Sequence, residues 1–261
     1  MLFWASPLEQ FRILVLFPLS VGSFDISITN SLMIMIIGFG SLLFLLRAVF
    51  PFSSSSSSDG VSVFLLPTSR WGIVMESMCI AIISLLEDNL GKKANTYAPF
   101  VLAIFLFVLQ ANLIGLVPYS FTVTSHLIVT FGLALTIFVG CNIIGVQYHK
   151  INLLSLFFPQ GTSLGLALLL VPIELVSYIF KPVSLAVRLF ANMMAGHTLL
   201  KVIAGFAWTM MKNGLFLLIA HFIPLLVLVL LIGLELGVAM IQAYVFTILT
   251  CIYLNDSINL H

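Results

Sequence analysis

Two stretches of this chain are apolar for longer than a membrane is thick. Residues 163–211 and 214–254 are almost continuously apolar and compatible with helix. At 1.5 Å per residue these helices would extend roughly 73 Å and roughly 60 Å, whereas the hydrocarbon core of a bilayer is about 30 Å thick. Each stretch is therefore either two spans with a hidden turn or one long helix at a steep tilt. A turn would fall best at Lys181-Pro182, although proline can also merely kink a membrane helix, so both alternatives stay open.

The composition excludes a soluble domain with a single membrane anchor. Hydrophobic residues make up 61% of the 261 residues and charged residues 7%, against about 25% charged in soluble domains. We therefore expect an all-α polytopic membrane protein. A net charge of +1 without a basic patch gives no indication of nucleic-acid binding.

Sequence motifs for enzymatic or metal chemistry are missing. The chain contains no HExxH, GxSxG, Walker A or CxxC motif and no Gly-rich nucleotide turn. Its cysteines are isolated in apolar surroundings, which is typical of buried free thiols. We therefore expect no catalytic residue, no bound metal and no cofactor.

The remainder of the chain divides into segments typical of a membrane protein. Residues 71–90 mix acidic and apolar side chains, which favours an amphipathic helix at the membrane surface or against a partner. The run "SSSSSSDG" is a polar linker of low complexity and indicates a loop insertion. We divide the chain into an N-terminal segment (1–29), a first transmembrane helix (30–50), a Ser-rich loop (51–70), the amphipathic helix (71–90), a transmembrane hairpin (97–147), the two long apolar stretches (163–254) and a C-terminal tail (255–261).

Basic residues predict the orientation in the membrane. Lys92, Lys93 and Lys150 lie at the outer ends of the hairpin, and Arg47 joins them if the first span ends there. Short loops on the matrix or cytoplasmic side of membrane proteins carry an excess of Lys and Arg. The hairpin ends are therefore predicted on that side and the N-terminus on the other.

A permanent cation, Arg188, lies inside the first long apolar stretch. On a helical wheel several polar or small residues fall within about 40° of it. Charged groups at membrane depth usually face a protein interior or a water-filled cavity and mark ion pathways, although snorkelling to the interface is the alternative. Glu174 is 14 residues away, roughly 21 Å along a straight helix, so an anionic partner must come from another helix or chain. The residues on this stripe are Glu174, Ser177, Lys181, Ser184, Arg188, Asn192 and Ala195.

The second long stretch contains one acid, Glu235. Gln242 and His221 share its helical face, and a GxxxG pattern around it permits close approach of a neighbouring helix. His197, away from the arginine face, could meet Glu235 if the two long helices pack antiparallel. Such a set favours a proton relay, with buried, hydrogen-bonded imidazoles as the alternative. For His126 we expect hydrogen bonding to a carbonyl or simple exposure, as for His149 and His261.

Two other classes of membrane protein could carry such a charged stripe. A self-contained proton-coupled transporter would use the charged stripe to line a substrate cavity, but such proteins usually show internal repeats with paired broken helices. No convincing repeat occurs here. A membrane oxidoreductase subunit would need histidines at matching depth, and no spacing picks out a pair.

Three motifs resemble one known family. "SLAVRLFANMMAGHTLLKVIAGFAW" (184–208) and "LELGVAMIQAYVFTILTCIYLNDSINLH" (234–261) resemble the subunit a family of F-type ATP synthases, and "ANLIGLVPYSFTVTSHL" (111–127) is similar to its hairpin turn. The resemblance covers nearly the whole chain and is strongest to the mitochondrial and alphaproteobacterial branch. Many bacterial members instead carry an acid where His197 stands and a histidine where Glu235 stands. The serine run has no counterpart.

The resemblance implies a fold, partners and a location. The fold would be an all-α polytopic membrane protein of about five membrane-embedded helices plus one amphipathic helix, with the last two long and strongly tilted in a hairpin. It implies a stator subunit, without a catalytic site for ATP, whose partners are the c-ring subunits, the peripheral-stalk and other F0 subunits, and membrane lipid. The implied location is the mitochondrial inner membrane, with a bacterial plasma membrane as the alternative.

The resemblance also implies roles for individual residues. Arg188 would keep each passing c-subunit carboxylate ionised between two offset half-channels and block a direct leak. It gives no role for Lys181 or His221. The remaining implied residues are Glu235 and His197 at the proton uptake side facing the intermembrane space, Asn112 lining it, Glu174 at the matrix exit, and Asn192 and Gln242 as polar companions of the arginine.

Overall fold

The computed structural model describes residues 7–21, 24–25, 27–49, 70–117, 120–150, 164–212 and 220–258. The Ser-rich run and Pro118-Tyr119 of the hairpin turn lie outside these ranges, as does His261. Helices dominate the described chain, which confirms the predicted all-α polytopic class. In chain order they are α1 (Asn30–Val49), α2 (Arg70–Leu90), η2 (Gly91–Lys93), α3 (Ala94–Gly115), η3 (Val123–Ser125), α4 (Leu127–His149), α5 (Leu164–Lys212) and α7 (Phe222–Ile258).

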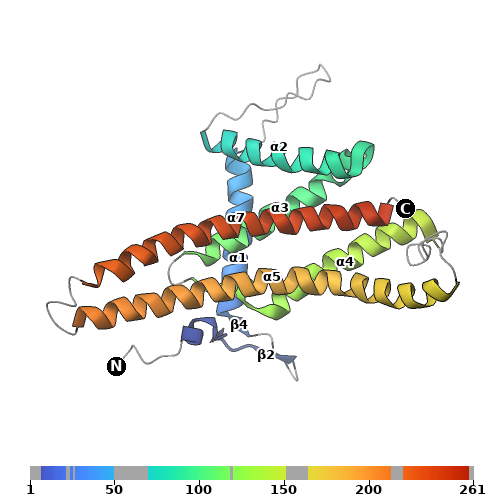
Figure 1. Ribbon diagram of the computed structural model, residues 1–261. Helices are drawn as coiled ribbons and strands as arrows, with labels where there is room; N and C mark the ends of the chain where they lie inside the picture. Colours follow the sequence, from blue (N-terminus) through green and yellow to red (C-terminus); the bar gives the residue numbers. More distant parts are fainter. Residues whose placement is uncertain are drawn as a thin grey trace, which may run out of the picture.

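Four of these helices are long and apolar enough to cross a membrane. They are α3, α4, α5 and α7, judged by length and composition. The first helix, α1, adds a shorter apolar stretch over Asn30–Phe44. The amphipathic helix α2 lies across the end of α1 that carries Arg47, as expected for a helix at the membrane surface (Figure 1).

The long stretch at 163–211 is one unbroken helix. The 49 residues of α5 continue through Pro172 and Pro182, so no turn occurs at Lys181-Pro182. Proline removes one backbone donor, but packing against neighbouring helices lets a membrane helix continue past it. Helices α5 and α7 lie side by side and antiparallel, and they run across α1 rather than along it (Figure 1). The strong tilt that the family resemblance implies for the long pair stays a prediction.

The core lies where α3 and α4 pack against the long pair. α4 packs on α5, while α3 and α4 both pack on the C-terminal half of α7. Ala186 and Ala243 are completely buried, and such small side chains let helices approach closely. The first turns of α7 remain outside this core, because the side chains of Phe222, Leu226 and Leu230 are more than 60% exposed. The largest fully buried apolar side chains are Phe246, Leu86, Leu185, Leu189, Leu254, Val101 and Val108.

The outer ends of the α3–α4 hairpin lie together, as a hairpin requires, while the side of the membrane that they face stays a prediction. Lys93 lies over the Tyr148 ring, 4.7 Å from its centroid. His149 Nε2 donates a hydrogen bond to the Ile258 carbonyl at 2.8 Å, which places the end of α7 on this same side. The interpretation of His149 as a histidine bonded to a carbonyl is confirmed.

The N-terminal segment forms short strands that the sequence did not predict. A 3-10 turn, η1 (Pro7–Phe11), precedes β1 (Val15–Phe17), which pairs antiparallel with β4 (Ile28–Thr29) directly before α1. A second small pair joins β2 (Ser20–Val21) to β3 (Phe24–Asp25). The segment lies beside α5, at the end of α1 opposite to α2 (Figure 1).

Candidate functional site

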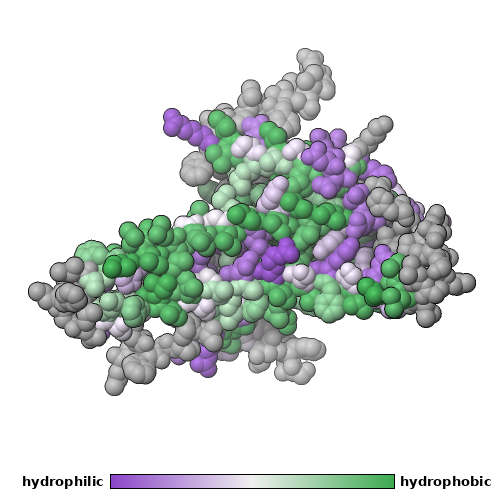
Figure 2. All heavy atoms as spheres, viewed as in Figure 1, coloured by the Kyte–Doolittle hydropathy of each residue, from purple (hydrophilic) through white to green (hydrophobic). Residues whose placement is uncertain are grey.

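The predicted stripe on α5 is an exposed face of the described chain. Ser184, Arg188 and Asn192 are exposed, whereas Leu185 and Leu189 on the other side of the helix are at most 1% exposed. Figure 2 shows this side of the molecule, where hydrophobic surface covers much of the long pair and a hydrophilic patch lies between the two helices. The polar stripe is thus open as one face, whereas Ile179, which the same wheel places opposite Arg188, is 54% exposed, so helical periodicity did not predict which side of α5 is buried.

Arg188 has no anionic partner in the part of the chain that the structure describes. It forms neither an ion pair nor a hydrogen bond there. Glu174 is half-buried on the same unbroken helix, and its 14-residue separation keeps it roughly 21 Å away. Arginine cannot lose its proton in a protein. A permanent positive charge is thus presented at membrane depth on an open helical face.

The predicted companions Asn192 and Gln242 are bonded to each other. The Asn192 amide nitrogen donates to Gln242 Oε1 at 3.0 Å, one turn along α5 from Arg188. Gln242 is 4% exposed, so this hydrogen bond joins the open face of α5 to the interior of the pair.

Glu235 lies against the backbone of α5 at Gly196. A Cβ at position 196 would overlap Glu235 Oε1 and lie 3.0 Å from its Cδ, so only glycine leaves room for the carboxyl group. His197 is the next residue, and its Nε2 is buried. The antiparallel packing therefore brings Glu235 and His197 to the same level, as predicted, without a direct hydrogen bond between them.

The GxxxG pattern around Glu235 does not mediate a close helix contact in the described chain. A Cβ at Gly233 or Gly237 would meet no atom within 4 Å. The expectation of close approach there is wrong for this chain's own helices; the close contact uses Gly196 instead. His221 precedes α7, and its ring lies 4.6 Å from the Phe222 ring at a tilt of 42°. It is roughly 21 Å along the helix axis from Glu235, so a shared helical face does not bring it to the site.

Asn112 reaches the long pair from α3. Its side chain is completely buried, and its amide nitrogen donates to the Ala239 carbonyl at 3.3 Å. Ala239 lies one turn beyond Glu235 on α7. The sequence-predicted residues of the uptake side, Asn112, His197 and Glu235, therefore come from three helices that meet in one region.

Several buried polar atoms of the described chain, including atoms of Asn112, His197 and Glu235, have no hydrogen-bond partner there. An unsatisfied buried donor or acceptor costs about 1–3 kcal/mol, and in folded proteins such groups usually bond to ordered water. The region therefore has the chemistry of a hydrated path through apolar protein. The atoms are Asn112 Oδ1, Thr124 Oγ1, His126 Nε2, His197 Nε2, both carboxyl oxygens of Glu235, and Gln242 Nε2.

Thr124 and His126 belong to this set although the sequence pattern did not indicate them. The expectation that His126 bonds to a carbonyl or is exposed is wrong: its ring stacks on Phe121 at 5.0 Å, with Nε2 buried. Burial lowers the pKa of the His126 imidazole, which keeps it neutral at pH 7. Its burial follows from the packing of η3 against α5, which no local pattern reveals.

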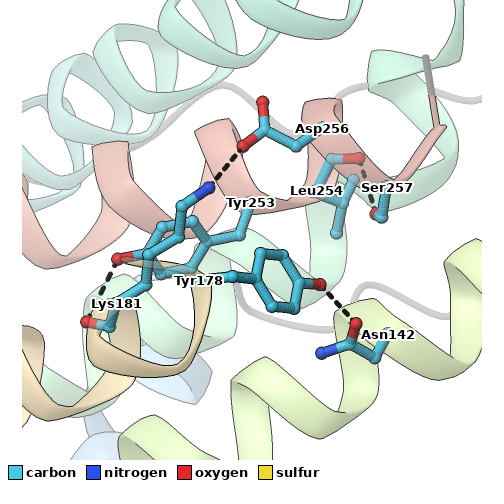
Figure 3. A network of polar contacts seen from close by, with 7 residues as sticks. All are labelled: Asn142, Tyr178, Lys181, Tyr253, Leu254, Asp256 and Ser257. Carbon is cyan, nitrogen blue, oxygen red and sulfur yellow. Dashed lines mark hydrogen bonds and ion pairs between the residues drawn. The ribbon is translucent and has the colours of Figure 1, made fainter. Parts of the chain in front are cut away.

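A second polar cluster joins α5, α7 and α4 on the side of the hairpin ends (Figure 3). Lys181 Nζ lies 2.8 Å from Asp256 Oδ2 and within 5.3 and 5.4 Å of the ring centroids of Tyr178 and Tyr253. The Tyr253 hydroxyl donates to the Lys181 carbonyl at 3.3 Å, and the Tyr178 hydroxyl donates to Asn142 of α4. Lys181, without a role from the resemblance, is thus an ion-pair partner of α7.

Three contacts define one register for the long pair. Lys181 meets Asp256, Asn192 meets Gln242, and Gly196 meets Glu235, so numbers rise along α5 as they fall along α7. Asp256 was missed because the chain was divided at residue 255, whereas α7 continues to Ile258.

Comparison with known proteins identifies the family. A family model described as ATP synthase A chain matches residues 15–255. ATP synthase subunit a of Pylaiella littoralis is 56% identical over 256 residues, which cover 98% of this chain and 99% of the relative. The subunits a of Chondrus crispus and Paramagnetospirillum magneticum are 50% and 45% identical, each over 98% of this chain and over 97% and 100% of the relative.

The fold and the site thus define a polytopic membrane protein with buried polar side chains between two long antiparallel helices. The chain belongs to the ATP synthase A chain family. The resemblance inferred from the three sequence motifs is confirmed.

Proposed function

We propose that the chain is the proton-translocating stator subunit of an F-type ATP synthase and conducts protons through two offset half-channels to and from c-ring carboxylates. Family membership supports a proton-channel subunit of this complex. The observation that carries the finer proposal is Arg188: an exposed, permanent cation at membrane depth without an anionic partner in the described chain.

The missing anion is supplied by a carboxylate of the moving ring. Opposite charges 4 Å apart attract by about 4 kcal/mol at an effective dielectric constant near 20. That attraction keeps a carboxylate ionised beside Arg188, so each ring carboxyl releases its proton before it passes. The small side chains of Ser184, Ala191 and Ala195 leave this face of α5 open to a close partner helix.

The positions of the two acids along α5 support two separate half-channels. Glu235 meets α5 at Gly196, eight residues and roughly 12 Å beyond Arg188, while Glu174 lies roughly 21 Å before it. Arg188 therefore separates the two acids along the helix. A proton cannot pass the fixed cation directly from one acid to the other. It must be carried by a ring carboxyl, and this requirement couples proton flow to rotation.

The buried polar atoms without hydrogen-bond partners in the described chain support an uptake half-channel. Glu235, His197 and Asn112 form the uptake half-channel, and the Asn192–Gln242 hydrogen bond connects it to the arginine face. Glu174 forms the exit half-channel.

The N-terminal segment lies near the uptake half-channel, and the basic hairpin ends lie near the exit. We place the uptake side toward the intermembrane space of a mitochondrion; in a bacterial plasma membrane the same side would face the periplasm. The ring, the peripheral stalk and the remaining membrane subunits are the partners, and ATP chemistry occurs elsewhere in the complex.

Replacement of Arg188 tests this function. In the complete complex, Arg188→Ala should reduce ATP-driven proton pumping about a thousand-fold, the factor that corresponds to about 4 kcal/mol. ATP hydrolysis by the detached catalytic sector should persist. Arg188→Lys should also fail, because lysine is a compact donor that can lose its proton when desolvated.

Lys212→Ala is the matched control, since it removes a cation from the end of the same helix. Proton pumping at the normal rate in Arg188→Ala would refute the assignment. Proton-coupled uptake of a solute by the purified chain alone would instead favour a self-contained transporter.

A further inference from the structure

Phe11 is the one buried side chain in the stretch from residue 9 to residue 19. It is 8% exposed, whereas its neighbours Gln10 and Arg12 are exposed. The Phe11 ring meets the His197 imidazole edge-on, with centroids 6.4 Å apart and planes at 70°. The turn that carries it, η1, packs on α5. An aromatic ring from the N-terminal segment therefore covers a histidine of the uptake half-channel.

The segment is fixed in this position by Asn30 at the start of α1. Asn30 Oδ1 accepts a hydrogen bond from the Leu14 backbone at 3.2 Å, and its amide nitrogen donates to the Arg12 carbonyl at 3.2 Å. Its backbone nitrogen donates to the Leu14 carbonyl at 3.1 Å. These three bonds join Arg12 and Leu14, one and three residues after Phe11, to the start of α1, so the ring is held by more than its own packing.

The two sides of His197 differ in polarity. Phe11 offers a ring without hydrogen-bonding groups, which excludes water. Glu235, which contacts α5 at the adjacent Gly196, instead contributes two buried carboxyl oxygens that lack partners in the described chain. Water enters buried space where polar groups can bond it and avoids apolar space.

We propose that Phe11 is a lid over His197, held closed by Asn30, which restricts access of water and protons to the side of His197 that faces Glu235. Phe11 is a positioning residue in this proposal: it touches His197 and exchanges no proton. The assignment of His197 to a half-channel rests on the proposed function, whereas the contact between Phe11 and His197 does not.

Chemical modification of His197 tests the lid directly. Membrane vesicles containing the complete complex are treated with diethylpyrocarbonate, and the rate of carbethoxylation of each histidine is followed by mass spectrometry. Phe11→Ala and Asn30→Ala should each raise the rate at His197 about ten-fold, because burial of a Phe ring is worth at least that factor. In the double variant the effects should not multiply, because both open the same lid.

Matched variants separate the lid from general loosening. Phe17→Ala removes the same side chain from the same segment at a position that is 63% exposed, and should leave His197 protected. Phe11→Leu keeps an apolar cover and should change the rate less than Phe11→Ala. His149, bonded to the Ile258 carbonyl at the other side of the bundle, is the internal reference. An unchanged His197 rate in Phe11→Ala, or an equal rise at His149, overturns the proposal.

A pumping assay distinguishes this proposal from the proposed function. The complex with Phe11→Ala should still pump protons. Diethylpyrocarbonate should inactivate pumping about ten times faster in this variant than in the complex without the substitution. Arg188→Ala should leave His197 protected. Faster modification of His197 without faster loss of pumping would confirm the lid while contradicting the role of His197 in the proton path.

Discussion

The polar side chains at the two ends of the α5–α7 contact differ in whether they are paired. Near the hairpin ends, Lys181 and Asp256 form an ion pair between two tyrosine rings. Near the N-terminal segment, the carboxyl oxygens of Glu235 and Nε2 of His197 are buried without partners in the described chain. Paired groups fix the register of two helices, whereas unpaired groups can bond water and transfer protons. The same two helices are thus joined by an ion pair at one end of their contact and carry unpaired buried polar groups at the other.

The largest effect should come from removing the acid of the unpaired end. Glu235→Gln keeps the shape of the side chain but cannot exchange a proton. We expect ATP synthesis driven by an imposed pH gradient to slow about a hundred-fold, the lower range for loss of a proton-transfer group. Glu87→Gln on the exposed side of α2 is the control and should be neutral. Normal synthesis in Glu235→Gln would count against the relay.

A smaller effect should come from displacing the same carboxyl group. Gly196→Ala places a Cβ where Glu235 Oε1 lies, so the acid must move. Overpacking of this kind costs about 1–3 kcal/mol, and we expect synthesis to slow about ten-fold. Gly205→Ala introduces the same side chain in the same helix where a Cβ meets no atom within 4 Å. Equal rates in the two variants would show that the Glu235 position is not critical.

The smallest effect should come from breaking the paired end. Its side chains are 31% and 32% exposed, so the Lys181–Asp256 pair should contribute about 1 kcal/mol or less to stability. A double-mutant cycle with Lys181→Ala and Asp256→Ala, read from the thermal stability of the complex, measures this coupling. Additive effects of the two substitutions would show that the ion pair contributes nothing to the register.

The local sequence pattern predicted some features of the fold that depend on helical periodicity. The apolar stretches indicated the helices, and the wheel around Arg188 grouped Ser184, Arg188 and Asn192, which lie together on the open side of α5. The sequence pattern could not decide whether α5 breaks at Pro182. Proline is compatible with a turn or with a continuous helix, and packing against the neighbouring helices decides between them.

Contacts between distant segments could not be predicted from local pattern. The register that places Glu235 on Gly196 depends on how α3, α4 and the long pair pack together, and GxxxG pointed to the wrong glycines. His126 and Phe11 were missed for a related reason. Their burial comes from short irregular turns, η3 and η1, that pack on α5 without an apolar repeat of their own.

The unbroken course of α5 has a mechanical consequence. One continuous rod of roughly 73 Å carries Glu174, Arg188 and Gly196 at fixed intervals. In the proposed function, force that the ring exerts on the guanidinium would act on both acid positions and would not be absorbed at a hinge. The offset between the two proposed half-channels would then be fixed by the residue spacing along one helix.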